Sequence, residues 1–218
     1  MVAIIRFLGT NCDYDMNFVY QDLLKQECAF VWHKEKSLPS GTKLVVLPGG
    51  FSYGDYLRSG AIASTAPIMG AIKNFANKGG LVLGICNGFQ ILTESGLLPG
   101  ALKRNIHLNF ICNHQELIIE NNDNIFLKSY QKKERISLPI AHADGNFYAD
   151  QKTLEELEDN RQILCSYVHN PNGSVKNIAG ICNKDKNVFG LMPHPERASD
   201  KTLGNTQGLQ MLRNLCEL

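Results

Sequence analysis

The sequence predicts a three-layer α/β fold in which a mostly parallel central sheet carries added antiparallel strands. In the first half, short apolar runs alternate with longer amphipathic stretches, as parallel strands and crossover helices do. In the second half, strand-like runs are separated by asparagine-rich turns, which are typical of antiparallel strands. Both halves therefore belong to one sheet-based domain.

The parallel half contains four predicted strands and three predicted helices. Apolar runs of strand length occupy residues 2–7, 28–33, 43–47 and 81–85. Amphipathic stretches predict helices over residues 14–27, 61–77 and 89–94. In the first helix, Phe18, Leu23 and Leu24 are expected to face inward. Three or four βα units in so short a segment indicate helices on both faces of the sheet.

The second half is predicted to extend or flank that sheet with antiparallel strands. The strand-like runs are residues 117–120, 135–140, 163–168, 178–182 and 188–192, and a helix over residues 202–215 follows them. The sequence shows no repeat, no low-complexity linker and no charge block. We therefore expect a single domain over residues 1–218.

Composition argues against several classes of protein. The chain has 218 residues, 22 Lys+Arg against 21 Asp+Glu, a formal net charge of +1 and 44% hydrophobic residues. A neutral balance argues against a nucleic-acid partner. No apolar run approaches the length of a membrane span, and the first residues lack the pattern of a secretion signal. We expect a cytoplasmic protein with no membrane partner.

The seven cysteines predict neither a disulfide framework nor a metal site. Their number is odd, and they form no CxxC pair and no zinc-type spacing with histidine. For six of them, including Cys12, we expect a small buried apolar side chain. Cys86 is the exception because of its neighbours.

Cys86 lies in a pattern that is typical of a nucleophile elbow. It follows a buried strand and precedes a helix, in the frame Gly84-x-Cys86-x-Gly88. The glycines allow a sharp turn with little bulk beside the nucleophile. The turn exposes the thiol at the top of the sheet, and the helix N-terminus favours the thiolate.

His194 and Glu196 are the predicted partners of Cys86. They lie two residues apart in Pro193-His-Pro-Glu196, where the prolines favour extended backbone and place both side chains on one side. His194 would act as acid and base, and Glu196 would orient it. His142, which has Asp144 in the same i, i+2 relation, remains an alternative base.

Backbone N–H groups at strand ends are the expected donors to an oxyanion. Gly49 and Gly50 follow the strand over residues 43–47, at the same edge of the sheet as the Cys86 turn. The Gly50 N–H and the Asn87 N–H, directly after the nucleophile, would form the oxyanion hole. An ordinary strand-ending turn also explains the two glycines.

These residues resemble the class I (triad) glutamine amidotransferases, which carry Cys-His-Glu on a flavodoxin-like sheet. Within that family the chain is most similar to the glutaminase subunits of phosphoribosylformylglycinamidine synthases. The segments that carry the likeness are residues 48–60, with the Phe-Ser-Tyr-Gly-Asp loop, residues 84–92 and residues 193–197. Leu8, where proline is common, and Ala143, where glycine is frequent, depart from the pattern in loops.

The resemblance implies further residues, a reaction and partners. Gln90 would help hold the substrate L-glutamine, and Phe110 would lie beside it. The reaction would release ammonia from glutamine through a cysteinyl thioester. The chain has no P-loop motif. No cofactor is therefore expected in this chain, and the family's ATP and magnesium would belong to a large synthetase subunit, with a small third subunit.

Three other interpretations of the function remain open. The chain could supply ammonia to another synthase, act as a stand-alone cysteine hydrolase, or be a non-catalytic flavodoxin-like binding module.

Docking on the synthetase subunit would use the 51–60 loop, with Arg58 and Arg197 as candidate contacts.

Overall fold

A computed structural model describes residues 1–217 and places them around a nine-stranded mixed sheet. The strand order is β2-β1-β3-β4-β11-β10-β9-β6-β7. A separate two-stranded sheet pairs β5 with β8. Leu218, the last residue of the predicted domain, lies outside the described residues. No helix in the described part of the chain is long and apolar enough to cross a membrane.

Five neighbouring strands form the parallel half of the sheet. They are β1 (Val2–Arg6), β2 (Cys28–Trp32), β3 (Leu44–Leu47), β4 (Leu81–Ile85) and β11 (Val188–Leu191). All residues of β3, β4 and β11 are buried, which is expected for parallel strands covered on both faces. The predicted parallel sheet is confirmed, and its carboxyl edge gathers the loops after β1, β3, β4 and β11.

The antiparallel half continues the sheet beyond β11. Its strands are β10 (Ile178–Cys182), β9 (Ile163–Tyr167), β6 (Ile111–Ile119) and β7 (Arg135–His142). The small second sheet consists of β5 (Ala101–Lys103) and β8 (Asn146–Tyr148). The added antiparallel strands are therefore present as predicted.

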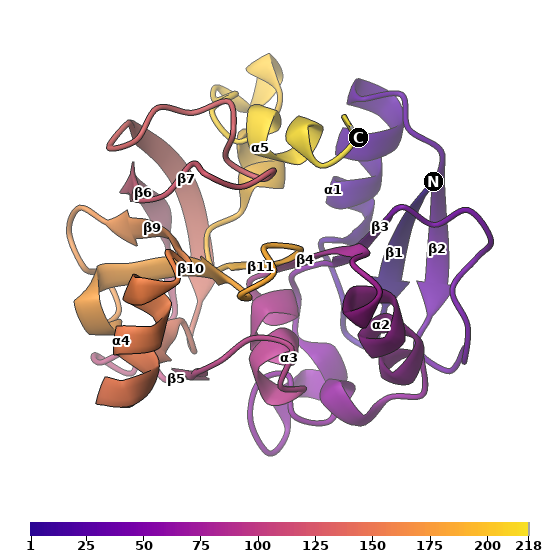
Figure 1. Cartoon of the computed structure of the whole chain (residues 1–218), viewed down its shortest axis with the longest axis horizontal. Helices are drawn as coiled ribbons and strands as arrows, with labels where there is room; N and C mark the ends of the chain where they lie inside the picture. The colour runs from indigo at the N-terminus through magenta and orange to yellow at the C-terminus, as the bar shows by residue number, and fades with distance from the viewer. Residues whose placement is uncertain (218) are drawn as a thin grey trace.

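Helices cover both faces of the sheet, so the predicted three layers are found. Figure 1 shows α1 and α5 on one side, and α2, α3 and α4 on the other. Their bounds are α1 (Asp13–Asn17), which continues as a π-helix over Phe18–Leu23, α2 (Ile68–Asn77), α3 (Asn87–Glu94), α4 (Gln151–Asp159) and α5 (Leu209–Asn214).

Three predicted helices differ from the structure in length or orientation. The helix expected over residues 61–77 begins only at Ile68, because Pro67 forces Ala66 into an extended conformation. The helix expected over residues 202–215 is reduced to α5, because Gly204 takes a left-handed conformation and ends a preceding short turn. In the first helix Leu23 and Leu24 are partly buried against the core as expected, but Phe18 is exposed, and the fully buried apolar side chains are Met16, Val19 and Tyr20.

Other elements were not predicted or were assigned wrongly. Helix α4 is absent from the prediction, although Asp150 caps it by accepting a hydrogen bond from the Thr153 N–H. Strand β6 is twice the predicted length because its first half pairs only with β7 and carries exposed polar side chains. The segment 188–192 is expected among the antiparallel strands; β11 does pair antiparallel with β10, but it also lies parallel to β4 and so joins the two halves of the sheet.

Candidate active site

Cys86 lies at the sharp turn between β4 and α3, as predicted. Its backbone angles are φ 51° and ψ −104°, which a residue with a side chain adopts only at a cost in strain. A Cβ atom on Gly88 would lie 1.9 Å from the Leu47 carbonyl oxygen, so glycine is required where α3 packs against β3. The strained turn holds the thiol at the carboxyl edge of the parallel strands.

The parallel pairing of β11 with β4 brings His194 to the same edge. Leu191 pairs with Ile85, so the chain leaving β11 passes beside the chain leaving β4. Residues Pro195–Ala198 then form a short 3₁₀ turn, not the extended backbone that the prolines were expected to impose. The turn still points Glu196 at His194, with 2.5 Å between Oε1 of the carboxylate and Nδ1 of the ring.

The His194–Glu196 pair is buried and strongly coupled. The exposed fractions are 1% for His194 and 2% for Glu196. Burial alone would lower the pKa of His194, but Glu196, Cys86 and Cys12 together raise it well above the ordinary histidine value. The Nε2 atom of His194 is buried without a hydrogen-bond partner among residues 1–217. This nitrogen is therefore free to exchange a proton with a reacting group.

Two backbone N–H groups beside Cys86 have no acceptor. Neither the Gly50 N–H nor the Asn87 N–H donates a hydrogen bond within the described residues. Gly50 has φ 148° and forms an isolated bridge with Thr10, and its Cβ would lie 2.8 Å from backbone atoms of that loop. Gly50 lines the same cavity as Cys86, and Asn87 directly follows Cys86, so both N–H groups fit the expected oxyanion hole, a role that stays a prediction.

A cavity of about 250 Å³ opens onto these groups. Its lining residues are Asn11, Cys12, Gly50, Phe51, Cys86, Phe110, Cys112, Ala141, His194 and Arg197. Phe110 is half exposed at the rim, where its ring lies 6.4 Å from that of Phe51. Larger cavities of about 490, 580 and 610 Å³ lie elsewhere on the described surface, but none of them is lined by a cysteine. We therefore take the cavity beside Cys86 and His194 as the candidate site.

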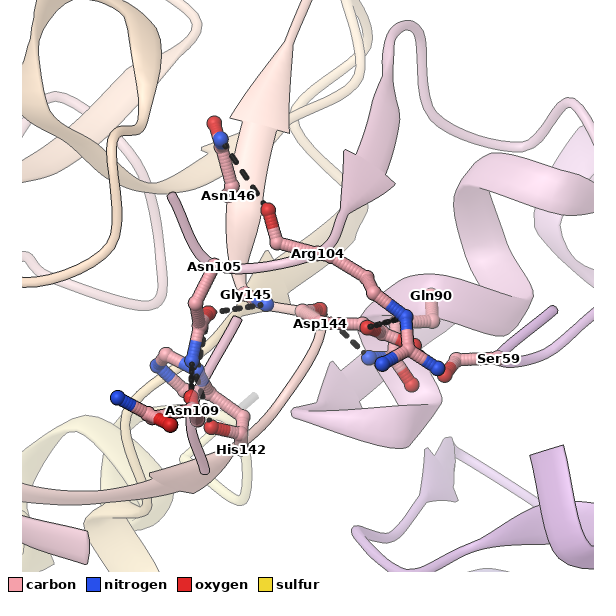
Figure 2. Close-up of polar contacts among 9 residues, drawn as sticks. All are labelled: Ser59, Gln90, Arg104, Asn105, Asn109, His142, Asp144, Gly145 and Asn146. Atoms are coloured by element: carbon pink, nitrogen blue, oxygen red, sulfur yellow. Dashed lines mark hydrogen bonds and ion pairs between the residues drawn. The ribbon is translucent and has the colours of Figure 1, made fainter. Parts of the chain in front are cut away.

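Gln90 lies one helical turn after Cys86 but faces away from the cavity. Its Nε2 donates to the Asp144 carbonyl oxygen at 2.7 Å, and its Oε1 accepts from Asn87 Nδ2 at 2.8 Å. Figure 2 shows its amide directed toward Asp144, whose carboxylate accepts from Ser59. Both ends of the Gln90 amide are thus bonded to protein, and its contact with glutamine stays a prediction.

His142 is not placed to act as the base. Its Nδ1 lies 3.0 Å from Asn105 Oδ1, and Asp144 bonds to Ser59 instead of to the imidazole (Figure 2). Burial, with a smaller contribution from His194, lowers the pKa of His142 to about 4. Ala141, its neighbour on β7, lines the cavity and places its carbonyl oxygen 3.6 Å from the Cys86 sulfur. The geometry therefore favours His194 over His142 as the base.

Cys12 also lines the candidate cavity, although its sequence neighbours predict only a small buried side chain. Its sulfur lies 3.1 Å from Arg197 Nη2. Within residues 1–217, Cys12, His194 and Glu196 form a group whose potential metal-ligand atoms lie within 4.8 Å of one another. Because the imidazole and the carboxylate already bond to each other, we interpret His194 and Glu196 as a base with its orienting partner and Cys12 as their neighbour. One signal could have identified Cys12: it follows β1 at the sheet edge that carries the nucleophile.

Comparison with known proteins gives a family that fits this geometry. A profile described as "CobB/CobQ-like glutamine amidotransferase domain" matches residues 1–214. The chain is 60% identical over 215 residues to phosphoribosylformylglycinamidine synthase subunit PurQ of Wolinella succinogenes, covering 98% of both chains. It is 58% identical to the Campylobacter jejuni protein of the same name, covering 97% of this chain and 94% of the relative.

Solved structures agree with these relatives. A chain from the structure of PurLQS from Thermotoga maritima superposes with a TM-score of 0.90 at 40% identity, covering 99% of this chain and 96% of that one. A glutamine amidotransferase from the same organism has a TM-score of 0.64 at 17% identity, with 99% and 96% covered, and supports the fold alone. With an elbow cysteine beside a buried His–Glu pair and a family match along nearly its whole length, the chain belongs to the CobB/CobQ-like glutamine amidotransferases.

Proposed function

We propose that this chain is the single-domain glutaminase subunit of a phosphoribosylformylglycinamidine synthase in purine biosynthesis. One observation supports the chemistry above all others: Cys86 on its strained turn shares a cavity with the buried His194–Glu196 pair. The identity of the reaction rests on full-length relatives that carry the name of this synthase subunit. The substrate is L-glutamine, and the products are glutamate and ammonia.

The first half of the proposed reaction forms a thioester. The Cys86 thiolate adds to the side-chain amide carbon of glutamine, and the carbonyl oxygen becomes an oxyanion held by the Gly50 and Asn87 N–H groups. Protonated His194 gives a proton to the amide nitrogen, and the carbon–nitrogen bond breaks to release ammonia. The raised pKa of His194 keeps the proton available for this step.

The second half hydrolyses the thioester. Neutral His194 takes a proton from water, and the resulting hydroxide adds to the thioester carbon. The carbon–sulfur bond then breaks, which releases glutamate and restores the Cys86 thiolate. The Glu196 carboxylate holds the imidazole through Nδ1, so that Nε2 faces the reacting atoms in both halves.

The ammonia would pass to a large synthetase subunit, in a complex with a small third subunit. We propose that ATP and magnesium act on that partner and that this chain needs no cofactor of its own. Purine synthesis also leads us to propose a cytoplasmic location. The transfer requires a docked partner, because ammonia that reaches bulk water is lost to the reaction.

Exposed apolar side chains mark the face that we propose for docking. They belong to three loops whose members Asn11, Phe51 and Phe110 line the catalytic cavity. These side chains are Leu8, Phe51, Tyr56, Leu57, Ile106, Leu108 and Phe110. Of the two cations considered for docking, Arg58 bonds to Glu94 at the surface, whereas Arg197 is turned toward Cys12.

The test of the proposed function is Cys86→Ala in the assembled complex. We expect glutamine-dependent product to disappear, because the residue that forms the thioester is gone. Ammonia-dependent product should remain, because the partner that uses ammonia is intact. Cys28→Ser, at the opposite edge of the sheet, is the matched control and should leave both rates unchanged.

Other outcomes would overturn the proposal in distinct ways. Unchanged glutamine use by Cys86→Ala would remove Cys86 from the chemistry. Glutamine hydrolysis by the wild-type chain without product from its synthetase partner would favour a stand-alone hydrolase or a different synthase. No glutamine turnover under either condition would favour a binding module.

A further inference from the structure

Cys12 is a second thiol in the catalytic cavity, and the proposed reaction gives it no task. It immediately precedes α1 and is 1% exposed, so it belongs to the cavity wall. Its N–H donates to the Gly49 carbonyl oxygen at 3.1 Å, next to the residue proposed for the oxyanion hole. The loop that carries Cys12 is thus fixed to the catalytic edge by backbone contacts.

The Cys12 sulfur lies between the catalytic pair and a guanidinium group. Its thiol donates to Asn11 Oδ1 at 3.2 Å, and the sulfur accepts from Arg197 Nη2 at 3.1 Å. The same sulfur lies within 4.8 Å of a ring nitrogen of His194 and a carboxylate oxygen of Glu196. Arg197, which directly follows Glu196, also lies 3.8 Å from Asp15 on α1.

The Cys12 sulfur, the His194 ring and Cys86 all lie close to Gly49. A Cβ atom placed on Gly49 would lie 3.1 Å from the Cys12 sulfur, 2.8 Å from Cε1 of His194 and 3.5 Å from Cβ of Cys86. The glycine therefore lets the thiol, the imidazole and the nucleophile pack around one point. An alanine at position 49 would push the three side chains apart.

We infer that Cys12 is a positioning residue for the glutaminase reaction, which holds the His194 imidazole and the Arg197 side chain in their catalytic arrangement. This inference rests on the proposed function. The polarisable sulfur would stabilise the protonated ring during ammonia release, and its bond to Arg197 would fix the turn that carries Glu196. Cys12 takes no part in bond formation with the substrate.

The charge of His194 depends on several groups, of which Cys12 is one. The titratable and charged groups that face His194 or its partner carboxylate are Cys86 before α3, Cys12 and Asp15 at the start of α1, His142 on β7, and Glu196 and Arg197 on its own segment. Removing Cys12 should lower the pKa of His194, because Cys12 is one of the groups that raise it. The imidazolium form would then be lost at a lower pH.

The test is the pH profile of glutamine hydrolysis by the complex with Cys12→Ala and with Cys12→Ser. For Cys12→Ala we expect kcat/KM to fall about tenfold, the loss of one charge-assisted hydrogen bond, and the alkaline limb to move to lower pH. Cys12→Ser keeps a small polar group. It should restore part of the lost rate and bring the alkaline limb part of the way back to its wild-type pH. It also provides the measurement if Cys12→Ala does not fold. Cys28→Ser is the control and should match wild type.

The failures of this inference and of the proposed function can be told apart. A wild-type complex that does not use glutamine contradicts the proposed function. With an active wild type, an unchanged rate and pH profile in Cys12→Ala contradicts the positioning role. A lower rate with an unmoved alkaline limb, or no gain from serine, also overturns it, because a purely structural defect would behave in that way.

Discussion

The parallel and antiparallel halves of the sheet contribute unequally to the site. The parallel half provides Cys86 after β4, the His194–Glu196 pair after β11, and Gly50 after β3. The antiparallel half provides a wall, through Phe110 before β6 and Ala141 on β7. The groups proposed for the chemistry therefore lie where parallel strands end side by side, and residues of the added strands line the other wall of the cavity.

The candidate site and the loop that carries Asn105 differ in their hydrogen bonding, although the antiparallel half also holds unpartnered buried atoms, such as His142 Nε2 and Tyr167 Oη. At the parallel edge, His194 Nε2 and the Gly50 and Asn87 N–H groups have no partner within residues 1–217. In the loop after β5, the buried side chain of Asn105 makes four hydrogen bonds, two to carbonyl oxygens and two from donors (Figure 2). We expect the unpartnered groups of the candidate site to bind substrate, and the fully bonded Asn105 side chain to hold the surrounding loops in place.

The largest effect should come from Glu196→Gln at the parallel edge. The amide keeps the size of the side chain but removes the charge that holds the imidazolium. We expect kcat for glutamine to fall about 10²- to 10⁴-fold, as for the orienting carboxylate of other triads. Steady-state kinetics of the complex measure this, and ammonia-dependent product is the internal control. A fall of less than tenfold would mean that Glu196 does not orient the base.

Asn105→Ala should lower the stability of the fold much more than it lowers the rate of the reaction. It leaves the Gly145 N–H, the His142 ring and two carbonyl oxygens without their buried partner. We expect the free energy of unfolding to fall by about 3 kcal/mol, while kcat changes far less than in Glu196→Gln. Denaturant unfolding and kinetics test this, with exposed Asn113→Ala as control. Loss of activity without loss of stability would contradict this division between the candidate site and the loop that carries Asn105.

The smallest effect should come from an ion pair on the surface. Lys152 and Glu156 lie 4.0 Å apart on α4, and both side chains are largely exposed. Lys152→Gln should change the free energy of unfolding by no more than about 0.5 kcal/mol, since such pairs are screened by water. Denaturant unfolding at low and high salt measures it. A loss of unfolding free energy as large as that of Asn105→Ala would show that this exposed ion pair stabilises the fold as much as the buried Asn105 amide does.

The same contrast explains what could be predicted from the sequence. Apolar strands and the Gly84-x-Cys86-x-Gly88 pattern are local signals, so the parallel half, the elbow and the His194–Glu196 pairing were predictable. Strand β6 was predicted only in part, because its exposed segment has no apolar alternation. The position of Cys12 depends on how loops from β1 and β11 meet, and no single segment of sequence encodes that meeting.

Turns were the least predictable part of the site. The prolines around His194 suggested extended backbone, but Pro195 begins a 3₁₀ turn, for which its fixed φ is equally suited. Gln90 lies at the predicted position on α3, yet its amide bonds to Asn87 and Asp144, partners that only the folded chain brings together. Sequence pattern thus identified the residue types, and tertiary contacts decided their orientation.

The most direct test of the central claim is covalent labelling with a diazo-ketone analogue of glutamine, followed by mass spectrometry of the peptides. We predict one label per chain, carried by Cys86, prevented by excess glutamine and absent from Cys86→Ala. Cys12 should stay unlabelled although it lines the same cavity, because it lacks the elbow and the oxyanion donors. Labelling of Cys12 in place of Cys86, or no glutamine-protected label at all, would contradict the account.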